Sequence, residues 1–456
     1  MTTNEETELE ELMHTFLKGR FWICLFLFGL LGCGDVEEIR KDSNSQQKNI
    51  QEFSENQNTN SSSEAVVYFS GNLQGYLEPC GCTRGQFGGM KRRANFITSL
   101  QTPGIYVENG DMTSMRERLD EMKQELILKC FQSLEYQVVN LGEKDLFLGI
   151  ERLLKSPVPL LSGNFRSSGK IVFPATHEIK TKTFSLTIIG LLSDSFRAEL
   201  LKVNPNYDLI PPKEALIEIM KTIPEDHRVL LMLHGSRFEG GPILANFPRI
   251  EAAICAHEYN MPQEASLLFP SGMYGKELGS LHFKKEEPLQ YKLIALNNSE
   301  QANPKIQPFI NDFYQKLTQE KNLIRPITNE YSTAHYVGSD TCLACHQNEY
   351  ETWKHSLHFK AIPTLKEKQQ DQNPECLRCH TVGYGLPSGF LKVDAPNAMT
   401  EKLGAVGCES CHGSGEIHLQ NPLISMKATA KSCLKCHTPE NSPTFDFVQY
   451  WPKIKH

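Results

Sequence analysis

Four copies of the pattern C-x-x-C-H fall in the last 115 residues of this 456-residue chain. They are CLACH (342–346), CLRCH (376–380), CESCH (408–412) and CLKCH (433–437). Two cysteines at this spacing can add to the two vinyl groups of a haem, and the adjacent histidine then lies under the iron as its proximal ligand. The pattern therefore predicts four covalently bound haem c groups in a small C-terminal domain.

Each motif would supply two thioether sulfurs and one proximal imidazole. The predicted residues are Cys342, Cys345, His346, Cys376, Cys379, His380, Cys408, Cys411, His412, Cys433, Cys436 and His437. With 14 cysteines and 15 histidines in the chain, chance would give roughly 0.014 such motifs, so four copies are specific. Two four-cysteine zinc sites or a disulfide framework are the alternatives, but neither explains a histidine after every pair.

A second imidazole on an iron gives a low-spin centre without an open position, which suits electron transfer. The candidate distal ligands are His358 (in WKHSLHFKAI) and His418 (in CHGSGEIH), followed by His456 and His355. His335 lies just outside the start of the domain. Each of these histidines could instead be a solvated surface residue.

The C-terminal phrases also resemble a known family. YVGSDTCLACH, the W-x-x-S-x-H of 353–358, CLRCHTVGYG, VGCESCHGSGEIH and the closing CLKCH are similar to the tetrahaem cytochrome c family whose type member accepts electrons from hydroxylamine oxidoreductase. The resemblance covers about 336–456 and implies a mostly helical, loop-rich domain in which stacked haems replace much of the apolar core. It also implies that one haem can lack a distal ligand.

Residues 1–33 have the features of a bacterial lipoprotein signal peptide. The apolar run 21–31 is too short to span a bilayer, and it follows two basic residues. The sequence LLGC (30–33) resembles a lipobox, in which Cys33 would be lipidated. An ordinary signal peptide with an incidental cysteine is the alternative, and a start at Met13 would give a more conventional signal.

The polar residues 34–63 cannot bury enough apolar surface to offset chain entropy, so we expect a disordered tether. A tether behind a lipid anchor would hold the folded part near a membrane of the bacterial cell envelope, in the periplasm or at a membrane surface. The expected partners are redox proteins and that membrane. The net charge of −7 is mild and no basic cluster is interleaved with aromatic residues, so nucleic-acid binding is not expected.

Between 64 and 300, short β-rich runs alternate with helical stretches, which predicts a layered α/β domain. The expected strands are 65–70, 104–109, 137–141, 186–192, 227–233 and 251–256, and the expected helices include 91–101 and 119–136. An amphipathic helix at 308–323 is expected within a helical connector, 301–335, that joins this domain to the C-terminal one.

Six segments of this region resemble, in order, the signature blocks of the metallophosphatase and 5′-nucleotidase family. They are SGNLQGYLEP, ENGDM, NLGEKDLFLG, LSGNF, LHGS and CAHEYN. The resemblance implies a scaffold built around two divalent ions that activate a water and clamp a phosphoryl oxygen.

The chain departs from that family at several ligand positions. Asn72 and Gln74 replace Asp and His, Glu143 and Lys144 replace Asn and His, and Tyr259 replaces the last His. The ligands that still match are Asp111, His234 and His257. We therefore expect a metallophosphatase-like scaffold that has lost its chemistry.

One motif belongs to neither pattern. Cys80 and Cys82 form a PCGC sequence that is followed by the Gly-rich TRGQFGGMKRR. Packing, or a disulfide to Cys130 or Cys255, is favoured over a redox or metal role in an oxidising compartment. The glycines indicate a phosphate-binding loop only weakly, because no G-K-S/T motif accompanies them.

These patterns predict an exported multihaem c-type cytochrome that relays electrons, and thus an electron-transfer protein more than a catalyst. One alternative is a haem oxidoreductase that acts on a small nitrogen compound at a five-coordinate haem. The other is a metal-dependent phosphohydrolase, which the replaced ligands disfavour.

Overall fold

The computed structural model describes residues 64–77, 88–101, 104–114, 118–257, 267–285, 287–297, 301–317, 319, 335–368, 370–386, 388–391, 398–438, 441–442 and 444–456. The predicted signal peptide with Cys33, the tether, Cys80, Cys82 and Tyr259 lie outside the described residues. Within the described ranges, no helix combines the length and apolar character needed to cross a membrane.

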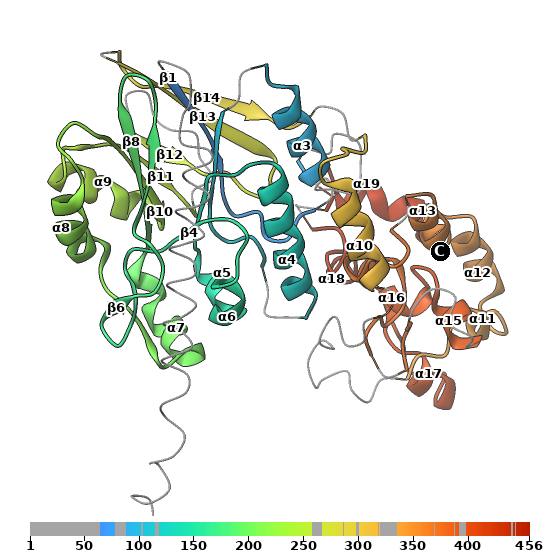
Figure 1. Ribbon diagram of the computed structural model, residues 1–456. Helices are drawn as coiled ribbons and strands as arrows, with labels where there is room; N and C mark the ends of the chain where they lie inside the picture. The colour runs from blue at the N-terminus through green and yellow to red at the C-terminus, as the bar shows by residue number, and fades with distance from the viewer. Residues whose placement is uncertain are drawn as a thin grey trace, which may run out of the picture.

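The N-terminal domain contains two β-sheets that pack face to face, with helices on both outer sides (Figure 1). The first sheet has six strands in the order β14-β13-β1-β2-β3-β4. Its strands are β1 (Glu64–Ser70), β2 (Ile105–Asn109), β3 (Val138–Asn140), β4 (Leu160–Leu161), β13 (Glu277–Lys284) and β14 (Gln290–Ala295). β1 to β4 run parallel, whereas β13 is antiparallel to β1 and to β14.

The second sheet has five strands in the order β12-β11-β10-β8-β7. Its strands are β7 (Thr176–Lys180), β8 (Ser185–Leu192), β10 (Arg228–His234), β11 (Ile250–Cys255) and β12 (Leu268–Pro270). All of them are parallel except β7, which is antiparallel to β8. A small third sheet joins β5 (Phe165–Ser167), β6 (Lys170–Ile171) and β9 (Tyr207–Leu209).

Alternating side chains of the central strands fill two different apolar layers. Val67 and Val107 of the first sheet pack with Ile188 and Leu230 of the second in the layer between the sheets. Ile189, the neighbour of Ile188, lies in the layer on the other face of the second sheet. Each fully buried side chain of this kind contributes roughly 1.5–3 kcal/mol to the free energy of folding. Because these strands are buried on both faces, both sets of alternating side chains are apolar, and the strands appear in the sequence as continuous apolar runs.

Helices cover the outer faces of both sheets (Figure 1). α3 (Met90–Ser99), α4 (Arg118–Ser133) and α10 (Gln307–Leu317) pack on the first sheet, and α8 (Pro212–Thr222) and α9 (Arg237–Asn246) pack on the second. Shorter helices follow the strand ends: α5 (Glu143–Phe147), α6 (Ile150–Leu153) and α7 (Arg197–Val203). Ile310 and Phe313 of α10 share one apolar cluster with Phe131 of α4, so this part of the expected connector belongs to the N-terminal core.

The C-terminal domain consists of short helices and loops. They are α11 (Ser339–Cys342), α12 (Gln347–Lys354), α13 (Ala361–Glu367), α14 (Pro374–His380), α15 (Ala398–Leu403), α16 (Cys408–His412), α17 (Glu416–Gln420), α18 (Ala430–Cys433) and α19 (Phe447–Tyr450). Two small apolar clusters lie among them, one around Leu377 and Phe390 and one around Trp353.

The two domains touch through polar contacts. The Lys123 ammonium on α4 lies 2.5 Å from a carboxylate oxygen of Glu375 on α14. Tyr314 of α10 donates a hydrogen bond to the Gln370 amide oxygen at 3.2 Å. The face of the N-terminal domain that carries α4 and α10 therefore contacts the C-terminal domain.

The sequence-based elements are confirmed, with shifted ends. The expected strands correspond to β1, β2, β3, β8, β10 and β11, and the expected helices correspond to α3, α4 and α10, which ends at Leu317. The predicted fold class, a layered α/β domain followed by a mostly helical, loop-rich domain, agrees with the structure.

A fully buried ion pair ties α3 to the first sheet. An Arg93 guanidinium nitrogen lies 2.7 Å from Glu108 Oε2, and both side chains are 0% exposed. The hydroxyl of Ser70 donates to the same carboxylate oxygen at 2.6 Å. Because the pair is buried and hydrogen-bonded, the removal of one partner leaves an uncompensated charge in the core.

We expect Glu108→Gln to lower the free energy of unfolding by about 3–5 kcal/mol, measured by urea denaturation of the full-length protein with far-UV circular dichroism. The control is Glu218→Gln, which breaks an exposed pair with Lys221 whose side chains are 69% and 64% exposed. The control should change stability by no more than about 0.5 kcal/mol. Equal effects of the two variants would contradict a special role of the buried pair.

Candidate functional site

Each C-x-x-C-H motif forms a single helical turn in the C-terminal domain. The backbone N–H of His346 donates to the Cys342 carbonyl at 2.9 Å, and the N–H of His437 donates to the Cys433 carbonyl at 2.9 Å. Residues four apart lie on one face of a helix, so the turn puts each histidine beside the first cysteine of its own motif. This is the arrangement that one haem attachment site requires.

The structure brings three of the four motif histidines next to a second histidine. The pairs and their ring-centre separations are His346 with His418 (6.0 Å), His437 with His358 (6.3 Å) and His412 with His456 (6.0 Å). A metal ion between two imidazoles, with bonds of about 2 Å, puts the ring centres on the order of 6 Å apart. The pairs therefore have the spacing of axial ligands on opposite sides of one iron.

Hydrogen bonds orient several of these rings. Nδ1 of His418 contacts the Ile424 carbonyl at 2.8 Å, and Nδ1 of His456 contacts the Ile454 carbonyl at 3.0 Å. A carbonyl can only accept, so Nδ1 carries the proton and the Nε2 lone pair stays available for a metal. Nδ1 of His412 contacts the Met426 carbonyl in the same way.

His380, the histidine of the second motif, differs from the other three. Its Nδ1 contacts the Ala361 carbonyl at 3.1 Å, but no histidine ring within the described residues makes a ring contact with it. His358 lies nearby, and burial together with His437 and His380 lowers the pKa of His358. Burial also lowers the pKa of His380, which favours the neutral form that binds metal.

The remaining candidate, His355, lies away from these pairs. It is exposed, and its Nδ1 contacts the Glu351 carbonyl at 2.8 Å in its own helix. The structure also leaves the exposed His335 outside the three pairs. Sequence reasoning ranked His355 close to His456, and the structure separates them.

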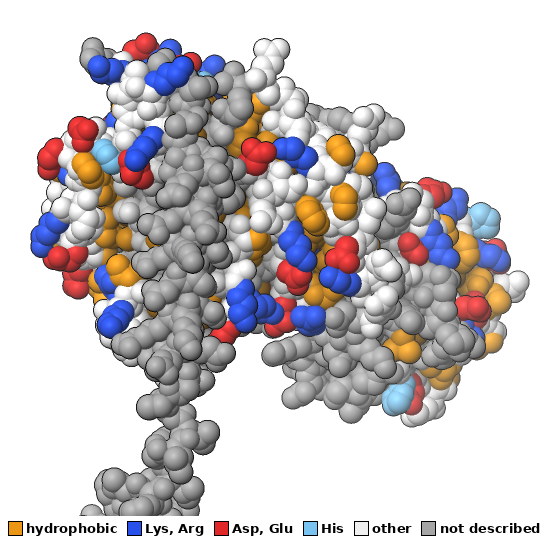
Figure 2. All heavy atoms as spheres, viewed as in Figure 1, with side chains coloured by type: hydrophobic (Ala, Val, Ile, Leu, Met, Phe, Trp, Pro, Cys, Tyr) orange, Lys and Arg blue, Asp and Glu red, His pale blue; other side chains and the backbone are white. Residues whose placement is uncertain are grey.

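Exposed apolar side chains are concentrated in the C-terminal domain. Of the fourteen large apolar side chains that are exposed among the described residues, ten lie in this domain. They are Leu343, Leu357, Phe359, Leu391, Ile417, Leu419, Leu423, Ile424, Leu434 and Val448. Figure 2 shows apolar side chains on the visible surface of this part of the molecule. A porphyrin would cover such surface, so the residues present fit haem c.

Thiols of different motifs lie side by side. The Cys342 and Cys408 thiols lie close enough to shift one another's pKa, as do those of Cys379 and Cys436, and Sγ of Cys436 lies 4.0 Å from the Cys379 carbonyl oxygen. The first attachment site therefore neighbours the third, and the second neighbours the fourth. α16 and α18 are also in contact, which brings the third site next to the fourth.

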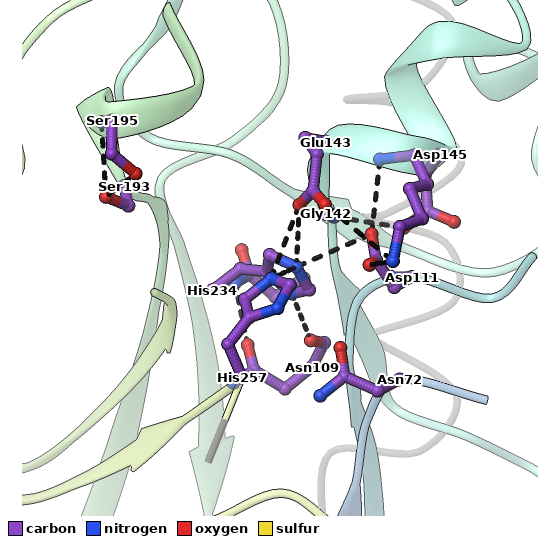
Figure 3. A network of polar contacts seen from close by, with 12 residues as sticks. Asn72, Asn109, Asp111, Gly142, Glu143, Asp145, Ser193, Ser195, His234 and His257 are labelled. Carbon is purple, nitrogen blue, oxygen red and sulfur yellow. Dashed lines mark hydrogen bonds and ion pairs between the residues drawn. The ribbon is translucent and has the colours of Figure 1, made fainter. Parts of the chain in front are cut away.

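A second cluster lies in the N-terminal domain, at the carboxyl ends of parallel strands. Asp111 follows β2, Glu143 opens α5 after β3, His234 ends β10 and His257 follows β11 (Figure 3). One ligand atom from each residue lies within 4.8 Å of the others. The structure thus brings together the three ligands that the sequence retained and adds Glu143, which sequence reasoning treated as a lost position although a carboxylate can also bind metal.

The charges in this cluster are strongly coupled. His234 Nε2 lies 3.0 Å from Glu143 Oε2 and 3.4 Å from Asp111 Oδ1. Burial would raise the pKa of the Glu143 carboxyl, but hydrogen bonds from His234 and His257 outweigh burial and lower it well below its usual range. Burial lowers the pKa of His234, but the two carboxylates raise it well above the ordinary value.

A buried polar layer holds the strand ends in place. Nδ2 of Asn109 donates to the Leu233 and Ile254 carbonyls at 3.1 and 3.0 Å, and Asn140 donates to the Asn109 side-chain oxygen at 2.9 Å. These bonds join the first sheet to the second directly beneath the cluster. They satisfy amide groups that would be costly to bury without partners.

Asp145 fixes the loop that carries Asp111. Its carboxylate accepts hydrogen bonds from the backbone N–H groups of Asp111 (2.8 Å), Met112 (2.9 Å) and Gly142 (3.0 Å). Burial and then the neighbouring Asp111 charge raise the pKa of Asp145 to about 7. On the other side of the loop, the Gln74 backbone N–H donates to the Asp111 carbonyl at 2.9 Å.

The family model described as cytochrome c554 and c-prime matches residues 341–413. The C-terminal domain resembles the cytochrome c554 family. A curated relative, cytochrome c-554 of Nitrosomonas europaea, is 33% identical over 97 residues, which are 18% of this chain and 40% of the relative. The chain thus spans less than half of that relative's length. This similarity supports haem c as the cofactor of the domain.

Solved structures with a related shape match the N-terminal part. The sulfate thiohydrolase SoxB of Thermus thermophilus, in complex with glycerol, has a TM-score of 0.49 at 13% identity, and the match covers 56% of this chain and 61% of that chain. A 5′-nucleotidase precursor from the same organism has a TM-score of 0.45 at 16% identity, over 56% of this chain and 59% of that chain.

We expect His418→Ala to convert one low-spin haem to a high-spin one, because the pair with His346 loses its second imidazole. Electron paramagnetic resonance of the oxidised, haem-loaded protein measures this change. The matched control is His355→Ala, which removes an exposed histidine outside the pairs and should leave the spectrum unchanged. A spectral change in the control, with none in His418→Ala, would contradict the pairing.

Proposed function

We propose that this protein is an exported tetrahaem c-type cytochrome that relays electrons between redox proteins in a bacterial cell envelope. The observation that carries the proposal is the set of three histidine pairs, 6.0–6.3 Å apart, in a domain with four C-x-x-C-H motifs. A bis-imidazole iron has no open position, which favours electron transfer over substrate binding.

The pairs support an assignment of the axial ligands. His346, His412 and His437 would be the proximal ligands of three haems, with His418, His456 and His358, respectively, as their distal ligands. The cysteines of each motif would hold the porphyrin by thioether bonds. Haem iron supplies one-electron chemistry when it is bound, and the chain fixes its axial ligands and covers its apolar edge.

The order of the attachment sites supports a relay. The neighbouring thiols and the α11–α16 contact support a first haem beside the third and a second beside the fourth, and the α16–α18 contact supports a third beside the fourth. Four haems attached at these motifs would follow one another in the order first, third, fourth, second. Electrons could enter at one end of this series and leave at the other.

A second function is favoured by one observation at His380. His358, the histidine near it, already pairs with His437, and no histidine within the described residues makes a ring contact with His380, so the second haem would be five-coordinate. Such an iron could bind a small nitrogen compound, and the protein would then be a haem oxidoreductase. A ligand such as nitric oxide or cyanide should bind one haem per chain under this alternative and none if an unassigned ligand closes the position.

The phosphohydrolase alternative has less support. Lys144 Nζ lies 2.8 Å from Asp111 Oδ2, so an ammonium already occupies one oxygen of the aspartate that two metal ions would share. Asn72 and Gln74, beside the same loop, offer amides in place of a carboxylate and an imidazole. These residues therefore favour electron transfer over phosphohydrolysis as the function.

The number of haems and their spin states test the proposal. The full-length protein, made together with cytochrome c maturation factors, should give four haems per chain in a pyridine haemochrome assay. Electron paramagnetic resonance should show low-spin and high-spin haem in a ratio of about three to one. Fewer than about three haems per chain would overturn the proposal. The double variant Cys376→Ala/Cys379→Ala should lose one haem and the high-spin signal with it.

The proposed location rests on Cys33 and the polar residues 34–63. We expect the full-length protein to fractionate with membranes and Cys33→Ser to move it to the soluble fraction, because a thioether-linked lipid would be the anchor. Immunoblotting of membrane and soluble fractions measures the shift. Equal partitioning of the two proteins would rule out lipidation at this cysteine and would leave an ordinary signal peptide.

A further inference from the structure

Four side chains in the N-terminal domain converge on one point, and the proposed electron transfer uses none of them. They are Asp111, Glu143, His234 and His257. Three are buried, and the side chain of His257 is 27% exposed. The cluster is therefore enclosed by protein but has one side that solvent can reach.

Four of the six separations between the ligand atoms are close to the edge length of a tetrahedral site, and all six are within 4.8 Å. His234 Nε2 lies 3.0 Å from Glu143 Oε2 and 3.4 Å from Asp111 Oδ1. His257 Nε2 lies 3.0 Å from His234 Nε2 and 3.5 Å from Glu143 Oε2. Four ligands held about 2.1 Å from one ion in tetrahedral geometry are roughly 3.4 Å apart. One ion could therefore contact all four.

A hydrogen bond to the backbone fixes which nitrogen of His234 faces the centre of the cluster. Nδ1 of His234 contacts the Asn109 carbonyl at 2.6 Å, and a carbonyl accepts only, so Nδ1 carries the proton. Nε2 is therefore the ring nitrogen that faces the carboxylates of Asp111 and Glu143. A cation at the centre would take the place of the proton on Nε2, and the imidazole and both carboxylates could then act as its ligands.

Two further features accompany the cluster. The Asn72 amide oxygen lacks a hydrogen-bond partner within the described residues, although Asn72 is 1% exposed. Figure 3 shows Asn72 beside the cluster. Asp111 and His257 both have φ of 56°, a left-handed conformation that costs energy for residues with a Cβ atom. Such strain concentrates at functional sites.

Lys144 limits the cluster to one ion. The Asp111 carboxylate turns Oδ1 toward His234, and its Oδ2 lies 2.8 Å from the Lys144 ammonium. An aspartate that bridges two ions needs both oxygens for metal. Here a fixed positive charge takes the place of a second ion.

The family resemblance already implies metal at Asp111, His234 and His257. We propose that this chain holds one divalent transition metal ion there in place of two, with Glu143 as the fourth ligand and the Lys144 ammonium in place of the second ion. Two imidazoles and two carboxylates suit Zn²⁺, and also Mn²⁺, Fe²⁺ or Co²⁺. Zn²⁺ is the probe of choice because it is not redox-active and can be counted separately from haem iron.

The experiment uses the full-length, haem-loaded protein after dialysis against a chelator. Zn²⁺ binding is measured by isothermal titration calorimetry, and bound zinc is counted by inductively coupled plasma mass spectrometry. We expect one zinc per chain with micromolar or tighter affinity. His257→Ala and the nearly isosteric Glu143→Gln should each weaken binding by about 100-fold or more. The control His282→Ala removes a partly exposed histidine of β13 in the same domain and should bind zinc as the unaltered protein does.

Unchanged far-UV circular dichroism and haem absorption show that a variant still folds. Zinc binding that is undetectable in the unaltered protein, or equal in it and in both site variants, overturns the proposal. Two zinc ions per chain, both lost in Glu143→Gln, would overturn the proposal that the site holds a single ion.

Lys144→Met should tighten zinc binding by about tenfold, because it removes a positive charge that repels the ion. Unchanged or weaker binding would overturn the role of Lys144.

Discussion

Three pairs of histidine rings stand 6.0–6.3 Å apart in a domain whose own apolar clusters are small. The partners of each pair come from distant parts of the sequence, as with His346 and His418. A haem iron between two rings would fix these segments relative to one another, and the porphyrin would supply apolar surface on both sides. Coordination and thioether bonds would therefore replace much of the chain-on-chain packing that holds the N-terminal domain together.

The N-terminal domain is held together by apolar packing and hydrogen bonds of the chain itself. Two sheets bury apolar side chains on both faces, and an amide layer joins them where parallel strands end. The linked Asn109 and Asn140 side chains hold four strand ends at a fixed distance. The residues that follow these strands, Asp111 and His257 among them, are thereby aimed at one point. The precision of the carboxylate and histidine cluster is a property of the sheets beneath it.

Much of the N-terminal fold was predictable because its central strands are buried on both faces and read as apolar runs, as in β8 and β10. β13 and β14 were missed, because Glu, Lys, Gln and His interrupt their apolar residues. The amphipathic pattern of α10 identified a helix but not the surface on which it packs. Periodicity shows that a face is apolar, and it does not show what covers that face.

The candidate sites were likewise predictable where the pattern is local in the sequence, and not where it depends on tertiary contacts. Short-range spacing revealed the C-x-x-C-H motifs, because the chemistry acts within one helical turn. The histidine pairs could not be derived, because a contact such as that of His358 with His437 depends on the tertiary fold. Glu143 was discounted because the resemblance expects an asparagine there. The structure shows its carboxylate beside His234, where a carboxylate oxygen can act as a metal ligand as well as an amide oxygen can.

The neighbouring thiols of Cys342 and Cys408, and of Cys379 and Cys436, have a consequence for biogenesis. A chain that folded before it received its cofactors would bring these sulfurs together, and an oxidising compartment would join them as disulfides between the wrong motifs. Such crosslinks would consume the nucleophiles that the porphyrin vinyl groups need. Assembly of such a protein would therefore need a fixed order, in which a reductant keeps the thiols free and cofactor attachment precedes final compaction. Crosslinked apoprotein that reductant restores to a competent form would be the signature of this order.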